Sequence, residues 1–198
     1  SSYGTLAAIT EITFKVLPAA DQSKTLVIHN LSVDYAPEYL NKAISSSNDI
    51  SGASFLPIEP YCKNCEMNIE KTFKLNDLRY KGSLTAIRIE GSQNSVNERM
   101  KNLQKELKIF DKKISVLETL QSEIFWKKVK NLEFLSATKN NILRIVIPPS
   151  ECINLIHEIP KQFKYFLDWG GALVWIEACD LSEQMFESIR KKVVRHGG

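Results

Sequence analysis

Apolar and polar residues alternate along several short stretches of the chain, which is the pattern of half-buried β-strands. Strands are predicted on this basis over Thr25–Asn30, Ile50–Pro57, Ser83–Glu90, Lys113–Leu117, Ile142–Ile147, Phe163–Trp169 and Ala172–Glu177. The segment Gly4–Pro18 alternates too, with Ile12, Phe14 and Val16 on one side, and a proline ends it. The chain is therefore expected to begin with a further half-buried strand.

Apolar residues spaced three and four apart indicate helices between these strands. The predicted helices are Tyr35–Ser45, Ser95–Leu107, Thr119–Leu135, Ser150–Ile159 and Leu181–Val194. The third helix has an apolar stripe, with Trp126 beside it, made of Ile124, Phe125, Val129 and Leu132.

The order of these elements is β-α-β-β-α-β in the first half of the chain and begins to repeat in the second. Glu90 and Glu177 close the third strand of each half, in AIRIEG and LVWIEA. Each half has the layout of a ferredoxin-like unit. The sequence thus predicts an α+β fold of duplicated ferredoxin-like (βαββαβ) antiparallel sheets with helices packed on them. The repeats are about 21–118 and 136–198, and helix 119–135 links them.

The fourth strand of the second repeat is not found before Gly198. The sheet edge at that place is therefore expected to be open, filled by a strand of another copy, or covered.

Composition bounds the class of protein. The 198 residues, 43% of them hydrophobic and 25% charged, suit one large globular domain or two small ones. The longest apolar run is too short to span a membrane, and no signal-peptide layout is found at the start, so an intracellular protein is expected. A formal charge of +3, with Lys and Arg mixed among Asp and Glu, gives no reason to expect nucleic acid or an anionic membrane as the partner.

The cysteines give little chemistry. Cys62 and Cys65 have C-x-x-C spacing in Glu59–Gly82, a stretch without a sustained period that we interpret as an excursion between strands. A structural zinc site needs four ligands, and no second pair follows. The other cysteines and histidines are scattered, at Cys152, Cys179, His29, His157 and His196. We therefore predict no metal site, and leave zinc half-site, redox pair and inert loop as alternatives for the two cysteines.

Lys164–Glu177, KYFLDWGGALVWIE, holds two short apolar runs that each carry a tryptophan, joined by Asp168–Gly171. Aromatic and β-branched residues on both sides of a glycine pair predict a β-hairpin. Its tryptophans belong either to the core or to a binding surface.

This hairpin resembles the C-terminal region of the FAD-binding subunit of bacterial glycolate oxidase, an FAD-linked oxidase of the vanillyl-alcohol-oxidase type. Further segments are similar to that family in the same order along the chain. They are GTL followed by ITE from Gly4, SGASFLP at Ser51–Pro57, SEIFWKK around Trp126 and LRIVIPPS at Leu143–Ser150. Together they span nearly the whole sequence.

The resemblance implies the C-terminal cap domain of an FAD-linked oxidase, over 21–198, preceded by the end of the FAD-binding domain in 1–20. It implies oxidation of a small 2-hydroxy acid, glycolate, with FAD held by the full-length protein and not by this chain alone. It also implies partners, a second flavoprotein subunit and an iron-sulfur subunit. The implied location is the cytoplasm, or the periphery of the inner membrane through those partners.

Two arginines are candidates for the substrate side. Arg144 and Arg88 each lie within a strand, and an arginine on a sheet face must find an anion or other acceptors. The partner is either a structural carboxylate, such as Glu90 or Glu177, or the carboxylate of the substrate.

Asp168 and Trp169 are expected at the rim over the flavin, and Trp126 joins them as a candidate for the substrate side. For Gly4 and Thr5, the resemblance implies contact with the flavin in the full-length protein, while a plain strand entry is the alternative. Catalytic residues stay unassigned.

Two other functions remain open. One is a non-catalytic ferredoxin-like module for binding or regulation, although the aromatic strand motif of RNA-reading sheets is absent from the sequence. The other is a subunit that only supports a flavoprotein partner.

Overall fold

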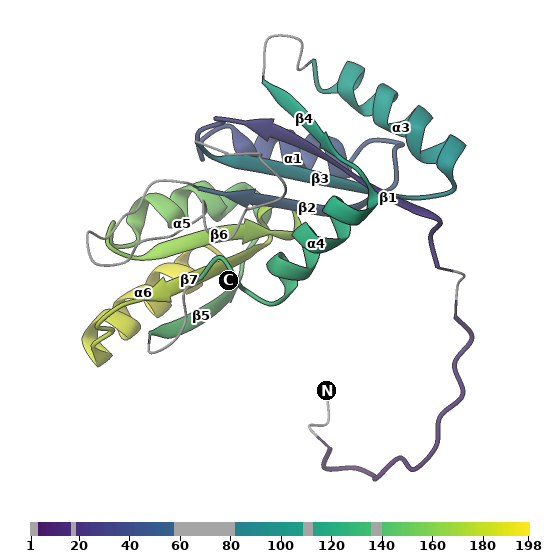
Figure 1. The fold of residues 1–198 in the computed structure, drawn as a ribbon. Coiled ribbons are helices and arrows are strands. Elements are labelled where there is room, and N and C mark those ends of the chain that lie inside the picture. The colour runs from purple at the N-terminus through teal and green to yellow at the C-terminus, as the bar shows by residue number, and fades with distance from the viewer. Residues whose placement is uncertain (1–3, 17–18, 58–81, 109–112, 136–139) are drawn as a thin grey trace.

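The computed structural model describes residues 4–16, 19–57, 82–108, 113–135 and 140–198. At its centre is one antiparallel sheet of seven strands in the order β4-β1-β3-β2-β6-β7-β5 (Figure 1). The strands are β1 Gln22–His29, β2 Ile50–Leu56, β3 Leu84–Gly91, β4 Ile114–Leu117, β5 Asn141–Val146, β6 Lys164–Asp168 and β7 Leu173–Ala178.

Helices cover both faces of this sheet. On one face lie α1 Ala36–Ile44, α3 Gln93–Glu106, α5 Cys152–Glu158 and α6 Glu183–Arg195. The other face carries a single described helix, α4 Thr119–Lys130, which crosses in front of the sheet in Figure 1.

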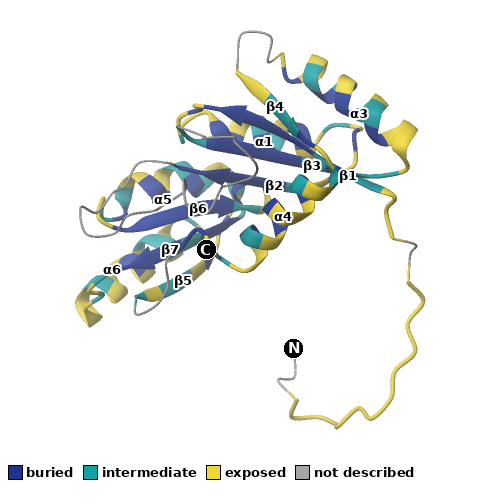
Figure 2. Cartoon of the chain, viewed as in Figure 1, coloured by how far each residue is buried: buried dark blue, intermediate teal, exposed yellow. Residues whose placement is uncertain are grey.

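Two hydrophobic clusters, one on each face, explain why the strands are so apolar. In β1, Leu26 and Ile28 pack toward the four helices while Val27 packs toward α4. All three side chains are at most 1% exposed. A strand covered on both faces becomes a nearly continuous apolar run, because neither set of alternating positions meets water. Figure 2 shows the central strands as mostly buried.

The sheet is built from two copies of one arrangement, which confirms the predicted fold class. The first copy has the order β4-β1-β3-β2, and the second has the same order without a fourth strand, β5-β7-β6. The two copies join into a single sheet where β2 pairs antiparallel with β6, at Phe55 opposite Leu167. The Ser54 hydroxyl also donates to the Leu167 carbonyl oxygen, at 2.7 Å.

Two predictions about local structure were wrong. Residues 4–16 contain no helix or strand and are exposed throughout, because their alternating apolar side chains have no neighbouring strand among the described residues (Figure 2). In α4 the buried face includes Trp126, whereas Ile124 is 38% exposed.

The linking helix is also shorter than its apolar pattern predicts. It ends after Lys130, and Leu132 already has a left-handed backbone, with φ 56°. Cys62 and Cys65 lie outside the described residues. Within the part of the chain that is described, no helix has both the length and the apolar character that a membrane span requires.

Candidate functional site

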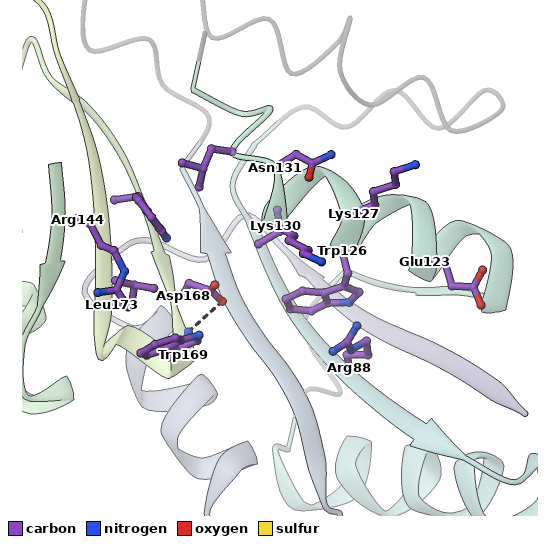
Figure 3. A pocket seen from close by; sticks show the side chains of 13 residues that line it. Arg88, Glu123, Trp126, Lys127, Lys130, Asn131, Arg144, Asp168, Trp169 and Leu173 are labelled. Atoms are coloured by element: carbon purple, nitrogen blue, oxygen red, sulfur yellow. Dashed lines mark hydrogen bonds between the residues drawn. The ribbon is translucent and has the colours of Figure 1, made fainter. Parts of the chain in front are cut away.

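A groove of about 640 Å³ lies between α4 and the strands of the second repeat. All five residues predicted for the substrate side line it: Arg88, Trp126, Arg144, Asp168 and Trp169. Figure 3 shows Trp126 with Arg88 on one side and Trp169 with Arg144 on the other, and Asp168 between the two pairs. The structure therefore brings together residues that are up to 81 positions apart, from Arg88 to Trp169.

Trp126 forms a fixed wall of this groove. Its indole Nε1–H donates to the Thr25 hydroxyl oxygen at 2.8 Å, and that hydroxyl also bonds the Ser122 hydroxyl at 2.7 Å. The ring lies flat against β2, where a Cβ placed on Gly52 would stand 2.9 Å from a ring carbon. A buried indole that is hydrogen-bonded at its edge and packed on backbone has a single position.

Arg88 is held by the protein. Its Nε lies 3.1 Å from the Ser51 hydroxyl oxygen and 3.2 Å from a Glu90 carboxylate oxygen. A terminal nitrogen donates to the Ser51 carbonyl oxygen, also at 3.1 Å. The guanidinium group stacks 5.0 Å from the centre of the Trp126 ring. Glu90 is thus the structural carboxylate that the sequence suggested, and the Nε–H and one terminal N–H of Arg88 are already engaged by the protein.

Arg144 is held differently. Its guanidinium carbon lies 5.3 Å from the centre of the Trp169 ring and 5.9 Å from that of Trp175. Among the described residues it has no carboxylate and no hydrogen-bond acceptor, and Glu177 pairs instead with Lys164 and Asn140. Aromatic faces can orient a guanidinium group while leaving its N–H donors free. Arg144 therefore presents a positioned cation with open donors to the groove.

The turn between β6 and β7 sets the position of Trp169. Its backbone is left-handed, with φ 51°, which is uncommon for a bulky residue and costs about 1–2 kcal/mol. The Asp168 carboxylate accepts the Trp169 backbone N–H at 2.9 Å and holds this conformation, as the dashed line in Figure 3 marks. The Trp169 side chain remains 55% exposed. The strained backbone of Trp169 thus places its aromatic side chain at the groove.

Two glycines make room for the same turn. Gly170 has φ 68°, and a Cβ there would stand 2.3 Å from Ile44 of α1. At Gly171, with φ 97°, a Cβ would stand 3.0 Å from the Cys152 sulfur. The W-G-G motif thus combines left-handed backbone with close packing, and both features favour glycine at these two positions.

Charge around the groove is mixed. Lys127 and Lys130 of α4 stand at its rim with Glu123 (Figure 3). Burial raises the pKa of Asp168, against the opposing effects of the Trp169 N–H and of the nearby Arg88 charge. The groove thus has basic groups at its rim and on its floor, which suit an anionic ligand.

Sequence reasoning missed two residues of the site. Trp175 stacks on Arg144 because the two lie opposite each other in the register of β5 and β7. Ser51 supplies both acceptors that hold Arg88 from β2. Trp175 could have been found from the predicted hairpin, since residues two apart on a strand share a face. Ser51 could not, because its pairing with Arg88 depends on tertiary register.

Gly4 and Thr5 lie on the exposed N-terminal segment and outside the lining of the groove, so their contact with a flavin stays a prediction. No glycine-rich turn leading from a strand into a helix, the usual cradle for a dinucleotide pyrophosphate, occurs in the described residues. The described part of the chain also holds no group of three or more metal-ligating side chains.

Comparison with known proteins places the fold. No protein-family model matches the sequence, and no curated protein matches it either. Among solved structures, alkyldihydroxyacetonephosphate synthase is similar over 91% of this chain, with a TM-score of 0.57. The α+β fold, with its seven-stranded antiparallel sheet, is thus shared with a part of that enzyme.

The likeness concerns the fold alone, since sequence identity to that enzyme is 8%. This chain spans 40% of the length of the enzyme. The substrate and the reaction must therefore be argued from the groove itself.

Proposed function

We propose that this chain is the cap domain of an FAD-dependent oxidoreductase that acts on a small 2-hydroxy acid, with glycolate as the first candidate. The groove between α4 and the second repeat would form the substrate side, and Arg144 would bind the substrate carboxylate. The partners implied by the resemblance, a second flavoprotein subunit and an iron-sulfur subunit, belong to the same proposal.

The observation that carries this proposal is the environment of Arg144. Two tryptophan rings orient its guanidinium group, and no described residue accepts from it. A planar guanidinium fork matches a carboxylate through two parallel N–H···O bonds. Arg88 lies in the same groove, but Ser51 and Glu90 occupy it, so Arg144 is the better candidate for the substrate.

FAD bound in the full-length protein would supply the hydride acceptor for oxidation of the 2-hydroxy acid to the 2-oxo acid, and the hydroxyl proton would leave to solvent. The residues of this chain contribute binding and orientation. Arg144 fixes the carboxylate, Trp126 and Trp169 limit the directions in which the substrate can lie, and Asp168 keeps the Trp169 turn in place. Positioning of this kind lowers the barrier by removing motions that the reactants would otherwise have to lose.

The test is substitution of Arg144 in the full-length, flavin-containing protein. Arg144→Lys keeps the charge and removes the fork, and Arg144→Gln removes both. We expect the glycolate concentration for half-maximal rate to rise about tenfold or more for lysine and further for glutamine, because a charge-assisted bond is worth about 1.5–3 kcal/mol. Melting temperatures should stay within about 2 °C of the parent protein.

Arg190→Gln is the matched control. Arg190 is an arginine of α6 that pairs with Glu187 at 3.6 Å on the protein surface. Loss of Arg190 should change neither the glycolate concentration for half-maximal rate nor the melting temperature. A normal glycolate requirement together with a lowered melting temperature in Arg144→Lys would show that Arg144 is structural. Unchanged kinetics and melting would remove Arg144 from the substrate side altogether.

A further inference from the structure

The outer edge of β5 offers unpaired backbone groups. The Ile147 N–H donates to the Ala172 carbonyl oxygen at 3.0 Å, in register with the β5–β7 ladder. In an antiparallel pair every second residue bonds to a given neighbour. The amide and carbonyl groups of Ile142, Arg144 and Val146 therefore point away from β7, toward a side where no described strand lies.

The first repeat shows what belongs there. The His29 N–H donates to the Lys113 carbonyl oxygen at 2.9 Å, and Val27 lies opposite Ser115. By the same alternation, Thr25, Val27 and His29 direct their backbone groups to β4. Val27 packs toward α4, and Arg144 lies on the corresponding face of β5. In the first repeat, β4 thus occupies the position next to β1 that is equivalent to the open position next to β5. We call this open position beside β5 the lane.

The helices confirm the difference between the repeats. In the first repeat, α3 buries Val96, Met100 and Leu103, whereas α6, its counterpart, buries only Ile189. Between α6 and β5 lies a groove of about 560 Å³. Large apolar side chains remain exposed in it: Val146 at 49%, Phe186 at 42% and Val194 at 65%. An apolar groove beside an unpaired strand edge is a place where a further strand can dock.

We propose that the segment of this same polypeptide that follows α6 forms a β-strand that pairs antiparallel with β5 in this lane. Its apolar residues at alternate positions would cover Phe186 and Val194. A source in the same chain is favoured because β4 directly follows α3 in the first repeat. There Ile114, the first residue of β4, lies opposite Ile28 near the C-terminal end of β1.

The geometry at the corresponding end of β5 fits this path. A Cβ on Gly198 would stand 2.7 Å from the Val146 carbonyl oxygen, one of the groups that points to the open side. The backbone after α6 has therefore already reached the place where the strand would begin. The strand would also hold the backbone of Arg144 from its second side, so the edge strand that carries the candidate ligand residue would be fixed on both flanks.

Hydrogen exchange of individual amides tests the proposal. The natural full-length polypeptide is compared with the chain 1–198. We expect the amides of Ile142, Arg144 and Val146 to exchange at least about tenfold more slowly in the longer protein, because hydrogen-bonded amides exchange only on opening. The amides of Leu143 and Ile145, which face β7, should change much less and serve as the internal control.

Three results would overturn the proposal. They are equal exchange in the two proteins, protection that rises with protein concentration, as a strand from a second copy would give, and a natural polypeptide with no residues after Gly198.

A covering domain could protect the edge of β5 from exchange without pairing with it, so a second measurement is needed. A copy of residues 113–117 is joined after Gly198 through a short flexible linker, beside a version with proline in place of the copied Ser115.

Ser115 faces β1 in the first repeat, so its copy should bond to β5, and proline removes that donor. The strand copy should raise the melting temperature by about 4 °C or more relative to the proline version. Equal melting temperatures would show that the lane does not accept a strand.

Discussion

Arg144 and Trp175 lie directly opposite each other in the register of β5 and β7, and the guanidinium carbon stands 5.9 Å from the centre of the indole ring. The pair spans two strands, so the position of the cation depends on the register of the sheet as well as on its own rotamer. Trp169, in the turn that follows β6, adds a second ring, whose centre lies 5.3 Å from the guanidinium carbon of Arg144. The candidate ligand residue is thus oriented by backbone pairing and by a strained turn together.

Replacing Trp175 by leucine should loosen Arg144 without removing it. Partly exposed cation–π contacts are worth about 0.5–1 kcal/mol, so the substrate concentration for half-maximal rate should rise about two- to fivefold in the full-length protein. Steady-state kinetics with glycolate measures this change. The same leucine substitution in an Arg144→Gln background should have no further effect, and an equal loss in both backgrounds would mean that Trp175 acts independently of Arg144.

Gly52 should be essential for the position of Trp126. A Cβ at residue 52 would stand 2.9 Å from one ring carbon, so Gly52→Ala must push the indole away from β2 or move the strand, at a cost of about 1–3 kcal/mol. Chemical denaturation measures the loss of unfolding free energy. Adding Trp126→Phe should recover part of that loss, because the smaller ring leaves space. A double variant that loses the sum of both single effects would contradict this packing.

Two buried threonines provide a matched test of the hydrogen-bond network behind the groove. Thr25 accepts from Trp126 Nε1 and bonds Ser122, so Thr25→Val leaves buried groups unpaired and should cost about 1–3 kcal/mol of unfolding free energy. The Thr85 hydroxyl is equally buried and has no hydrogen-bond partner among the described residues. Thr85→Val should therefore be neutral or stabilising, and equal losses at the two positions would contradict the network.

The end of α6 should make stability depend on pH. The His196 ring bonds Glu151 at 2.9 Å and Glu158 at 3.2 Å, and these bonds raise its pKa above the ordinary 6.5. The neighbouring Asn154 and then His196 lower the pKa of Glu151 below 4.5. A raised histidine pKa stabilises the fold at pH values below 6.5, and this contribution disappears as pH rises through the folded pKa. A lowered carboxyl pKa stabilises the fold above pH 4.5 and is lost in acid.

Both contributions are thus present together between about pH 4.5 and 6.5. In His196→Gln the melting temperature should fall within that window and change little above it. The groups lie at the surface, so added salt should reduce the difference. A pH-independent difference between parent and variant would show that the charge of His196 contributes nothing.

Much of the fold follows from the sequence because each signal is local. The turn chemistry of Asp168–Gly171 predicts the hairpin, and the repeated order of elements predicts the duplicated ferredoxin-like fold. Helix α4 shows the limit of such reasoning: its apolar stripe suggested that Ile124 is buried, but it is Trp126 that packs against β2, at Gly52, and Ile124 is 38% exposed. That contact joins two segments far apart in the chain, and no local period reports it.

The sequence pointed to five residues that line the groove, but neither to Trp175 and Ser51 nor to the arrangement of the side chains. Arg88 and Arg144 look alike in sequence, because each lies between apolar residues within a predicted strand. Only the register of the sheet decides that Glu90 and Ser51 hold the first, while two aromatic rings hold the second. The N-terminal segment shows the opposite case, since its residues alternate as in a strand but have no strand beside them within the part of the chain that the structure describes.

The pairing between β2 and β6 has a consequence for the groove. Arg88 comes from the first repeat, Arg144 and the Asp168–Trp169 turn come from the second, and the linking helix that carries Trp126 belongs to neither. One repeat alone has neither the facing wall nor the helix that closes the groove. The groove therefore exists only while β2 and β6 hold the two repeats in one sheet, so a substitution that separated these strands would abolish the groove before it unfolded either repeat.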